Sequence, residues 1–363
     1  MSDISGELVE IVKSAYQQSQ PLKIVGANTK EFLGRNVGGQ VVNVGAHSGI
    51  LEYQPVELVL TARAGTSLLE IQQALAEQQQ MLSFEPPVFS ASAFVSSSGA
   101  TLGGTLAANL SGPSRPWTGS IRDMVLGVKL INGRGELLNF GGKVMKNVAG
   151  YDLARTQAGA LGGLGLMTEI SLKVLPKPQL RMSLSVEIDE TAAILLMNQL
   201  SASAKPIDAA CWVNQRLYLR LSGSSSSVEQ SAKQWQLDYG FKIEQQGEKF
   251  WRDLTEYQLP QMDSQQPLWR FSINPTSAPL NVRGECIIDW GGAQRWVSGE
   301  QDLAQLQQQA EQAGGSVALW RNGDRSSEVN HPLPVAMQQL QQRLKHSLDP
   351  KNIFNPGRLY SWL

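Results

Sequence analysis

The chain has 363 residues, of which 42% are hydrophobic and 17% are charged, and its formal net charge is −1. A chain of this length exceeds the usual size of one domain, so we expect two domains that together can bury a large cofactor. The near-zero net charge provides no strongly basic surface for a nucleic-acid backbone, which argues against nucleic acid as a partner.

The first part of the chain alternates predicted helices and strands. Apolar residues at helical spacing over residues 5–19 predict a helix, and residues 22–26 predict a short strand that leads into a loop. A β-like run over 56–65 precedes an amphipathic helix over 66–81, which begins with two hydroxyl residues suited to capping. Residues 90–109 are rich in Ser, Ala and Gly, which allow a ligand to approach the backbone closely.

Two β-rich runs then flank the sequence Asn-Gly-Arg-Gly. They cover residues 123–133 and 134–140 and predict a β-hairpin. A further strand over 169–176 ends at Pro176 and Pro178, which mark the predicted end of a first domain that spans residues 1–178.

Residues 179–335 are predicted to form a second, α+β domain. Its strands and helices follow a β-α-β-β-α-β-like order, which is typical of an antiparallel, ferredoxin-like sheet. The serine-rich residues 222–227 are interpreted as a flexible turn inside this domain. The last segment, residues 336–363, continues a final helix and ends in an aromatic tail that we expect to pack on the first domain.

Cysteine and histidine are sparse. Cys211 and Cys286 form no C-x-x-C pair, so this chain is not expected to hold an iron–sulfur cluster. The three histidines are scattered and predict no metal site. The N-terminal sequence lacks the basic flank and apolar run of a signal peptide, and no apolar stretch is long enough to cross a bilayer. We expect a cytoplasmic protein, peripheral at most at the inner face of the cell membrane.

Three glycine-bearing segments could place backbone N–H groups against a pyrophosphate. They are Gly26–Lys30, Thr101–Gly112 and Gly159–Gly165, and each alone is more simply a tight turn. Neither G-x-G-x-x-G after the first strand nor G-x-x-x-x-G-K-[ST] occurs in the chain. An ordinary dinucleotide or ATP fingerprint is therefore excluded.

Taken together and in order, the segments resemble the p-cresol methylhydroxylase type of FAD-binding domain, which the vanillyl-alcohol oxidase superfamily shares. The resemblance covers most of residues 20–178 and the closing DPKNIFNPGRLY. Within that superfamily, GGKVMKNVAGYDL, SGPSRP and NPGRLY are similar to the E subunits of bacterial glycolate oxidase, also called glycolate dehydrogenase. The resemblance implies an α+β fold: a two-subdomain FAD-binding domain, a ferredoxin-like cap domain, assigned by analogy, and a tail that returns to the FAD-binding domain.

The resemblance also implies where FAD lies. Main-chain groups of the first loop, Gly26–Lys30, and of the second loop, Leu102–Gly112, would hold the pyrophosphate. Ser120 and Asp123 would lie beside the loops, a turn at 150–152 would approach the flavin, and the backbone at 169–170 would meet the adenine. The expected FAD-binding residues are Gly26, Ala27, Asn28, Thr29, Lys30, Leu102, Gly103, Gly104, Ala107, Ala108, Asn109, Ser111, Gly112, Ser120, Asp123, Gly150, Tyr151, Asp152, Glu169 and Ile170.

The first loop departs from its relatives at one point. Relatives often have a second glycine where this chain has Ala27 and Asn28, and Asn tolerates a positive φ better than most residues. Covalent FAD attachment in the superfamily uses a His or Cys, and neither residue occurs in the two loops. We therefore expect non-covalent FAD, and a structural role for His47.

The resemblance implies a subunit that works with a sister FAD subunit and an iron–sulfur subunit. The complex would oxidise glycolate or a similar small 2-hydroxy acid to the 2-oxo acid. This reaction needs a base and a cation for the carboxylate, and the His-rich motifs of related single-chain dehydrogenases are absent. His331, with Arg321 and Arg325 upstream, is more simply structural, so no catalytic residue is assigned.

Two alternatives remain open. The chain could be an autonomous flavoenzyme that acts on another small substrate or uses a nicotinamide donor. It could also be a non-catalytic assembly subunit that keeps the FAD fold only as a scaffold. An activity assay of the isolated chain distinguishes an autonomous enzyme from a subunit. The flavin content of the purified chain distinguishes a scaffold from an FAD-carrying subunit.

Overall fold

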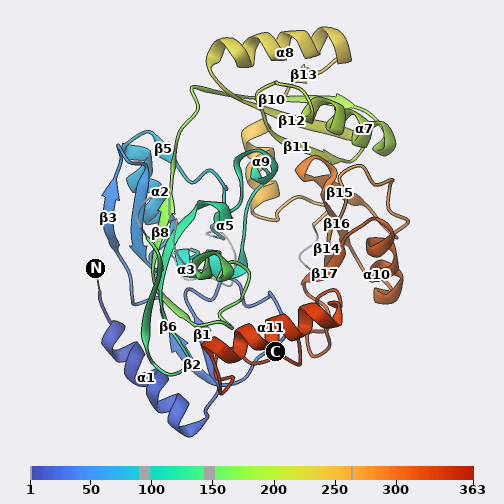
Figure 1. The fold of residues 1–363 in the computed structure, drawn as a ribbon. Helices are drawn as coiled ribbons and strands as arrows, with labels where there is room; N and C mark the ends of the chain where they lie inside the picture. Colours follow the sequence, from blue (N-terminus) through green and yellow to red (C-terminus); the bar gives the residue numbers. More distant parts are fainter. Residues whose placement is uncertain (1, 90–98, 143–151, 263–264) are drawn as a thin grey trace.

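The computed structural model describes residues 2–89, 99–142, 152–262 and 265–363. Two sheets dominate these ranges. A five-stranded sheet has the order β3-β4-β8-β6-β7, and an eight-stranded sheet has the order β13-β10-β12-β11-β15-β16-β14-β17. In Figure 1 the five-stranded sheet lies on the left, the eight-stranded sheet runs along the top and the right, and α3 and α5 lie between them.

The N-terminal elements build the five-stranded sheet and the helices around it. They are α1 (Ser5–Gln18), β1 (Leu22–Val25), β2 (Gln40–Asn43), β3 (Ile50–Gln54), β4 (Val59–Arg63), α2 (Leu68–Glu77), β5 (Gln80–Met81), α3 (Leu102–Ala108), α4 (Arg115–Thr118), α5 (Ile121–Met124), β6 (Val125–Ile131), β7 (Leu137–Gly141), α6 (Leu153–Thr156), β8 (Leu166–Lys173) and β9 (Leu175–Pro176).

Local sequence explains where several of these elements begin and end. Helix α1 buries Leu8, Val12 and Ala15 on one face, as its apolar spacing predicts. The predicted hairpin forms between β6 and β7, where the side-chain oxygen of Asn132 accepts hydrogen bonds of 3.0 Å from the backbone N–H groups of Arg134 and Glu136. These two bonds satisfy donors that the tight turn leaves without ladder partners.

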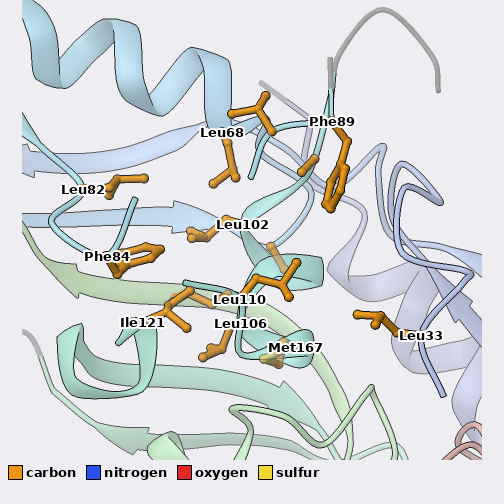
Figure 2. Packing of buried hydrophobic residues seen from close by; sticks show 14 of the residues in the cluster. Leu33, Leu68, Leu82, Phe84, Phe89, Leu102, Leu106, Leu110, Ile121 and Met167 are labelled. Atoms are coloured by element: carbon orange, nitrogen blue, oxygen red, sulfur yellow. The ribbon is translucent and has the colours of Figure 1, made fainter. Parts of the chain in front are cut away.

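One core joins α2 and α3 to the sheet. Figure 2 shows Leu68 of α2, Leu102 and Leu106 of α3, and Met167 of β8 within this cluster, and each of these side chains is buried. The small residues of α3 let the helix approach the sheet closely, because a Cβ atom on Gly103 would lie 2.8 Å from the Cβ of Ala64. This packing fixes the position of the second loop.

The second half of the chain builds the eight-stranded sheet and the final helix. Its elements are β10 (Leu180–Glu187), α7 (Glu190–Ser201), β11 (Ile207–Val213), β12 (Arg216–Gly223), α8 (Ser225–Tyr239), β13 (Lys242–Ile243), α9 (Gly247–Thr255), β14 (Leu268–Ser272), β15 (Cys286–Asp289), the 3₁₀ turn η1 (Trp290–Gly292), β16 (Gln294–Ser298), α10 (Leu303–Gln312), β17 (Ser316–Arg321) and α11 (Val335–Leu348).

The first four strands of this sheet have the ferredoxin-like arrangement. Their order is β13-β10-β12-β11, neighbouring strands are antiparallel, and α7 and α8 make the two crossovers. The α+β prediction is confirmed here. The sheet then continues through β15, β16, β14 and β17, so the predicted series is one half of a larger antiparallel sheet.

The flexible turn predicted over residues 222–227 is wrong. Helix α8 begins at Ser225, and the hydroxyl of Ser224 accepts a hydrogen bond of 3.4 Å from the backbone N–H of Ser227. A serine run provides an N-cap as readily as it provides a loop, and here the following apolar periodicity continues the helix.

The C-terminal segment returns to the N-terminal elements. The Nζ atom of Lys345 in α11 donates to the carbonyl of Gly163 at 2.7 Å, and the carbonyl of Ile353 accepts from the N–H of Leu22 at 2.7 Å. The domain boundaries at 178 and 335 remain predictions. Across the described ranges, no helix is both long enough and apolar enough to cross a membrane.

Candidate cofactor site

A pocket opens where the loop after β1 faces the start of α3. All five residues of the first loop, Gly26–Lys30, line it. From the second loop, Gly103, Gly104, Ala107 and Ala108 line it. The structure therefore brings together two predicted segments that lie far apart in the sequence.

Glycine lets the two loops approach each other. A Cβ atom on Gly26 would lie 2.6 Å from the Oγ1 of Thr101, and one on Gly104 would lie 3.1 Å from the same atom. Asn28 adopts a φ of 57°, which explains how the loop forms where relatives often carry glycine. The two loops therefore present backbone groups to the pocket instead of side chains, as binding of a diphosphate requires.

Two cationic side chains line the pocket beside these loops. Lys30 is buried, and burial lowers the pKa of its ammonium group to about 7. Its Nζ atom donates to the Thr29 hydroxyl at 3.0 Å and, in the described part of the chain, forms no salt bridge. Arg358 also lines the pocket, and burial lowers its pKa. The charge of Glu256 favours the charged form of Lys30, and that of Glu31 favours the charged form of Arg358. A bound diphosphate would favour the charged forms further.

The third glycine segment and the C-terminal tail complete the pocket. Leu161, Gly162 and Gly165 line it together with Asn355 and Arg358. Asn355 ties these parts together, because its Nδ2 donates to the Leu161 carbonyl at 2.7 Å and its Oδ1 accepts from the backbone N–H of Ile24 at 2.9 Å. The sequence had indicated the third glycine segment as a possible pyrophosphate loop and the tail as a segment that packs on the first domain, but it did not indicate the contact between them.

The other predicted residues of the second loop do not line the pocket. Leu102 is fully buried in the core, and Asn109 ends α3 with a φ of 50°. The Ser111 hydroxyl accepts from the N–H of Ile121 at 3.3 Å. Gly112 lies against Glu85, where a Cβ atom would come within 2.4 Å of the Glu85 carbonyl oxygen. These residues stabilise the second loop through contacts outside the pocket.

The predicted residues outside the loops have local structural contacts. Ser120 and Asp123 form a capping box on α5, in which the Ser120 N–H and hydroxyl both donate to the Asp123 carboxylate at 2.8 Å. Asp152 is exposed and caps α6, whereas Gly150 and Tyr151 lie outside the described residues.

The two β8 residues predicted to meet the adenine have other contacts. Glu169 pairs with Lys129 at 2.9 Å, and Ile170 is fully buried in the core. Neither lines the pocket, although Met167 of the same strand does. Contact between the β8 backbone and the adenine remains a prediction.

The histidines examined as candidates lie apart from this pocket. His47 is buried, its Nδ1 accepts from the N–H of Ile4 at 3.2 Å, and burial lowers its pKa. His331 lies 3.5 Å from Glu311, and its carbonyl accepts from the Tyr360 hydroxyl. No group of three His, Cys, Asp or Glu side chains suited to a metal ion occurs within the described ranges.

Comparison with known proteins identifies an FAD-binding domain in this chain. A family model described as an FAD binding domain matches residues 5–141, which include both loops. The structure of p-cresol methylhydroxylase with bound substrate superimposes with a TM-score of 0.68 over 99% of this chain and 87% of that chain, at 14% identity. The structure of alkyldihydroxyacetonephosphate synthase superimposes with a TM-score of 0.64 over 97% of this chain and 75% of that chain, at 16% sequence identity. The chain thus carries an FAD-binding domain and shares the fold of p-cresol methylhydroxylase.

Relatives in sequence define the family more narrowly. Glycolate oxidase subunit GlcE of Escherichia coli K12 is 43% identical over 362 residues, which cover 99% of each chain. The chain belongs to the GlcE family of glycolate oxidase subunits. Glycolate oxidase subunit GlcD of Bacillus subtilis 168 is 33% identical over 147 residues, 40% of this chain and 30% of that protein. A D-lactate dehydrogenase of Anaerostipes hadrus is 30% identical over 183 residues, 50% and 36% of the two chains.

Proposed function

We propose that this chain is the FAD-carrying subunit of a complex that oxidises glycolate, or a similar small 2-hydroxy acid, to the 2-oxo acid. One observation carries the proposal: a single pocket is lined by the first loop, the start of α3, the third glycine segment and the tail. Similarity to GlcE over 99% of both chains supports the same conclusion for the chain as a whole.

The pocket residues suit FAD. Backbone groups at Gly26–Lys30 and at Gly103–Ala108 would hold the pyrophosphate, and Lys30 and Arg358 would neutralise it. Among the described residues that line the pocket, none is a His or Cys, and we propose that FAD is held without a covalent bond. Bound FAD supplies the electron acceptor, and the residues of this chain bind it, orient it and keep water away from it.

The partners follow from the named relatives and from the cysteines of this chain. E. coli GlcE and B. subtilis GlcD are both named as glycolate oxidase subunits, which supports a sister subunit with its own FAD-binding domain. Cys211 is buried within the eight-stranded sheet, and burial raises the pKa of Cys286 to about 12, so neither thiol is poised to bind iron. We propose that a separate iron–sulfur subunit takes the electrons onward.

Co-expression with the neighbouring subunits tests the proposal. The purified complex should contain FAD and iron, and glycolate should reduce its flavin without oxygen. An isolated chain that is reduced by glycolate equally fast would make it an autonomous enzyme. A chain that holds no FAD in the active complex would make it a scaffold. Either result would overturn the proposed role.

A further inference from the structure

Two arginines from different parts of the chain lie over the ring of one tryptophan. The Cζ atom of Arg115, in α4, lies 4.5 Å from the ring centroid of Trp290, and that of Arg270, in β14, lies 5.2 Å from the same centroid. Arg270 also lies 5.0 Å from the ring centroid of Trp320. Both arginines are half-buried, and the aromatic rings remove water from their flat faces.

Neither arginine forms a salt bridge with any of the described residues. Within the described part of the chain, no carboxylate lies within salt-bridge distance of Arg115 or Arg270, and Arg270 donates its Nε proton to the amide oxygen of Gln294 at 2.8 Å. Burial lowers the pKa of both guanidinium groups, and the charge of Arg115 lowers that of Arg270 further. By contrast, Arg220 of the same sheet contacts both Glu85 and Asp208. The charge of Asp123 favours the charged form of Arg115, and that of Asp289 favours the charged form of Arg270, but neither carboxylate pairs directly with its arginine. Two half-buried cations without a directly paired carboxylate are costly unless an anion joins them.

Two further buried hydrogen-bond donors lie beside Arg270. Among the described residues, the indole Nε1 atoms of Trp296 and Trp320 have no hydrogen-bond partner, and the centroids of their rings lie 5.3 Å apart. Trp296 is directly opposite Arg270 in the pairing of β14 with β16, so the two side chains share one face of the sheet. Buried donors normally have acceptors, and a cluster that lacks them points to a ligand that carries oxygen atoms.

The arginine pair lies at the junction with the cofactor site. The Nε1 atom of Trp290 donates to the carbonyl of Gly112, in the second loop, at 3.0 Å. On the other side, tilted and stacked rings lead from Trp320 through Tyr257 to Phe89, whose ring centroid lies 5.5 Å from the ammonium group of pocket residue Lys30. An anion bound by the arginines would therefore lie where the eight-stranded sheet meets the second loop.

We propose that Arg115 and Arg270 bind the carboxylate of a small 2-hydroxy or 2-oxo acid, an identification that rests on the proposed function for the nature of the acid. A guanidinium group presents paired donors that match the two oxygens of a carboxylate. Gln294 is a positioning residue, because its amide oxygen accepts from Arg270 while its Nε2 donates to Asp289 at 3.2 Å. The carboxylate would thus be held by one residue next to the second loop and one residue of the eight-stranded sheet.

Binding to the isolated, FAD-loaded chain tests the site without turnover. Oxalate, which is not a 2-hydroxy acid, is titrated while tryptophan fluorescence and the flavin difference spectrum are recorded. We expect saturable binding that ethylene glycol, a neutral molecule of similar size, does not reproduce. Arg270→Met and Arg115→Met should each weaken binding by about tenfold or more. Arg134→Met, in the exposed β6–β7 turn, should leave it unchanged.

The variants in the whole complex separate this inference from the proposed function. Arg270→Lys should bind oxalate more tightly than Arg270→Met, because it keeps the positive charge. In the whole complex, the KM for glycolate should rise in both Arg115→Met and Arg270→Met. The site is wrong if wild-type chain shows no saturable oxalate signal, or if folded Arg115→Met binds oxalate as wild type does. A complex that oxidises glycolate with unchanged KM in both variants would overturn the site and leave the function standing. A complex inactive on glycolate, with oxalate binding still lost in the variants, would overturn the function and keep the site.

Discussion

Arg220 donates hydrogen bonds from its Nη2 atom to both carboxylate oxygens of Glu85, at 2.9 and 2.8 Å. Arg220 belongs to β12 of the eight-stranded sheet, and Glu85 lies before α3 in the N-terminal half. Both side chains are largely buried, and Asp208 also binds Arg220, at 2.6 Å. This ion cluster ties the eight-stranded sheet to the part of the chain that carries the cofactor pocket.

Glu85→Gln should destabilise the chain by about 3 kcal/mol, because removing one charge of a buried pair leaves its partner under-compensated. Urea unfolding of the isolated chain measures the change in the free energy of unfolding. Glu187→Gln is a matched control, since Glu187 is exposed and pairs with Arg216 at 3.0 Å on the surface. An exposed pair contributes about 0–1 kcal/mol, so equal effects of both substitutions would contradict the expected burial of the cluster.

Gly104→Asp should abolish most FAD binding. The new side chain would lie against the Thr101 hydroxyl and place a negative charge where the diphosphate is proposed to lie. Gly38→Asp is the control, because Gly38 is exposed and a Cβ atom there meets nothing within 4 Å. The flavin-to-protein ratio after gel filtration measures the effect. Stoichiometric FAD in folded Gly104→Asp would mean that the start of α3 does not hold the cofactor.

FAD affinity should fall as the pH rises above 7. Burial lowers the pKa of Lys30 to about 7 in the cofactor-free chain, and a nearby diphosphate favours the charged lysine and raises that pKa again. FAD binding above pH 7 should therefore take up a proton, which calorimetry in buffers of different ionisation enthalpy measures. Lys30→Met should bind FAD more weakly and with a flatter pH dependence.

The same pKa shift fixes the sign of a stability change. Without FAD, the unfolded chain binds the Lys30 proton more tightly than the folded chain does between pH 7 and the ordinary lysine pKa of 10.5. The contribution of Lys30 to the free energy of unfolding should consequently rise with pH through this window. Wild type and Lys30→Met should differ in their pH dependence there, and parallel curves would contradict the shifted pKa.

The sequence predicted local structure better than it predicted long-range contacts. The β6–β7 hairpin and the ferredoxin-like strand order follow from turn residues and periodicity, which act between near neighbours. The approach of Arg115 and Arg270 to the same Trp290 ring depends on how an eight-stranded sheet packs against the second loop, and no local pattern encodes it. The role of Asn355 could likewise not be predicted, although its tail resembles that of the family. Its two hydrogen bonds reach Ile24 and Leu161, which lie far from it in the sequence.

Acid precipitation of the purified chain should release its flavin into the supernatant. The described residues that line the pocket offer no His or Cys for a covalent bond to FAD. Flavin absorbance in the supernatant and in the washed pellet measures the two fractions. Yellow colour that stays with the denatured protein would contradict non-covalent binding and would direct attention to residues outside the described ranges.

The isolated chain should bind a small acid without oxidising it at a useful rate. Arg115 and Arg270 provide the proposed carboxylate site, but His47 contacts the N-terminal Ile4 and His331 contacts the C-terminal Tyr360, so neither histidine serves that site. A positioned general base contributes about a hundredfold to ten-thousandfold to such a reaction, and its lack should leave the flavin oxidised. The decisive measurement mixes FAD-loaded chain with excess glycolate or D-lactate without oxygen and follows flavin absorbance before and after the partner subunits are added.

Bleaching only after that addition would place the chemistry in the sister subunit. Bleaching within seconds by the isolated chain would instead mean that it holds a complete active site. Asp289 would then be the first residue to test, because burial raises its pKa to about 7 and it is linked to Arg270 through Gln294. Asp289→Asn should slow the bleaching if Asp289 is the base, and oxalate affinity in the same variant would show whether Arg270 had kept its position.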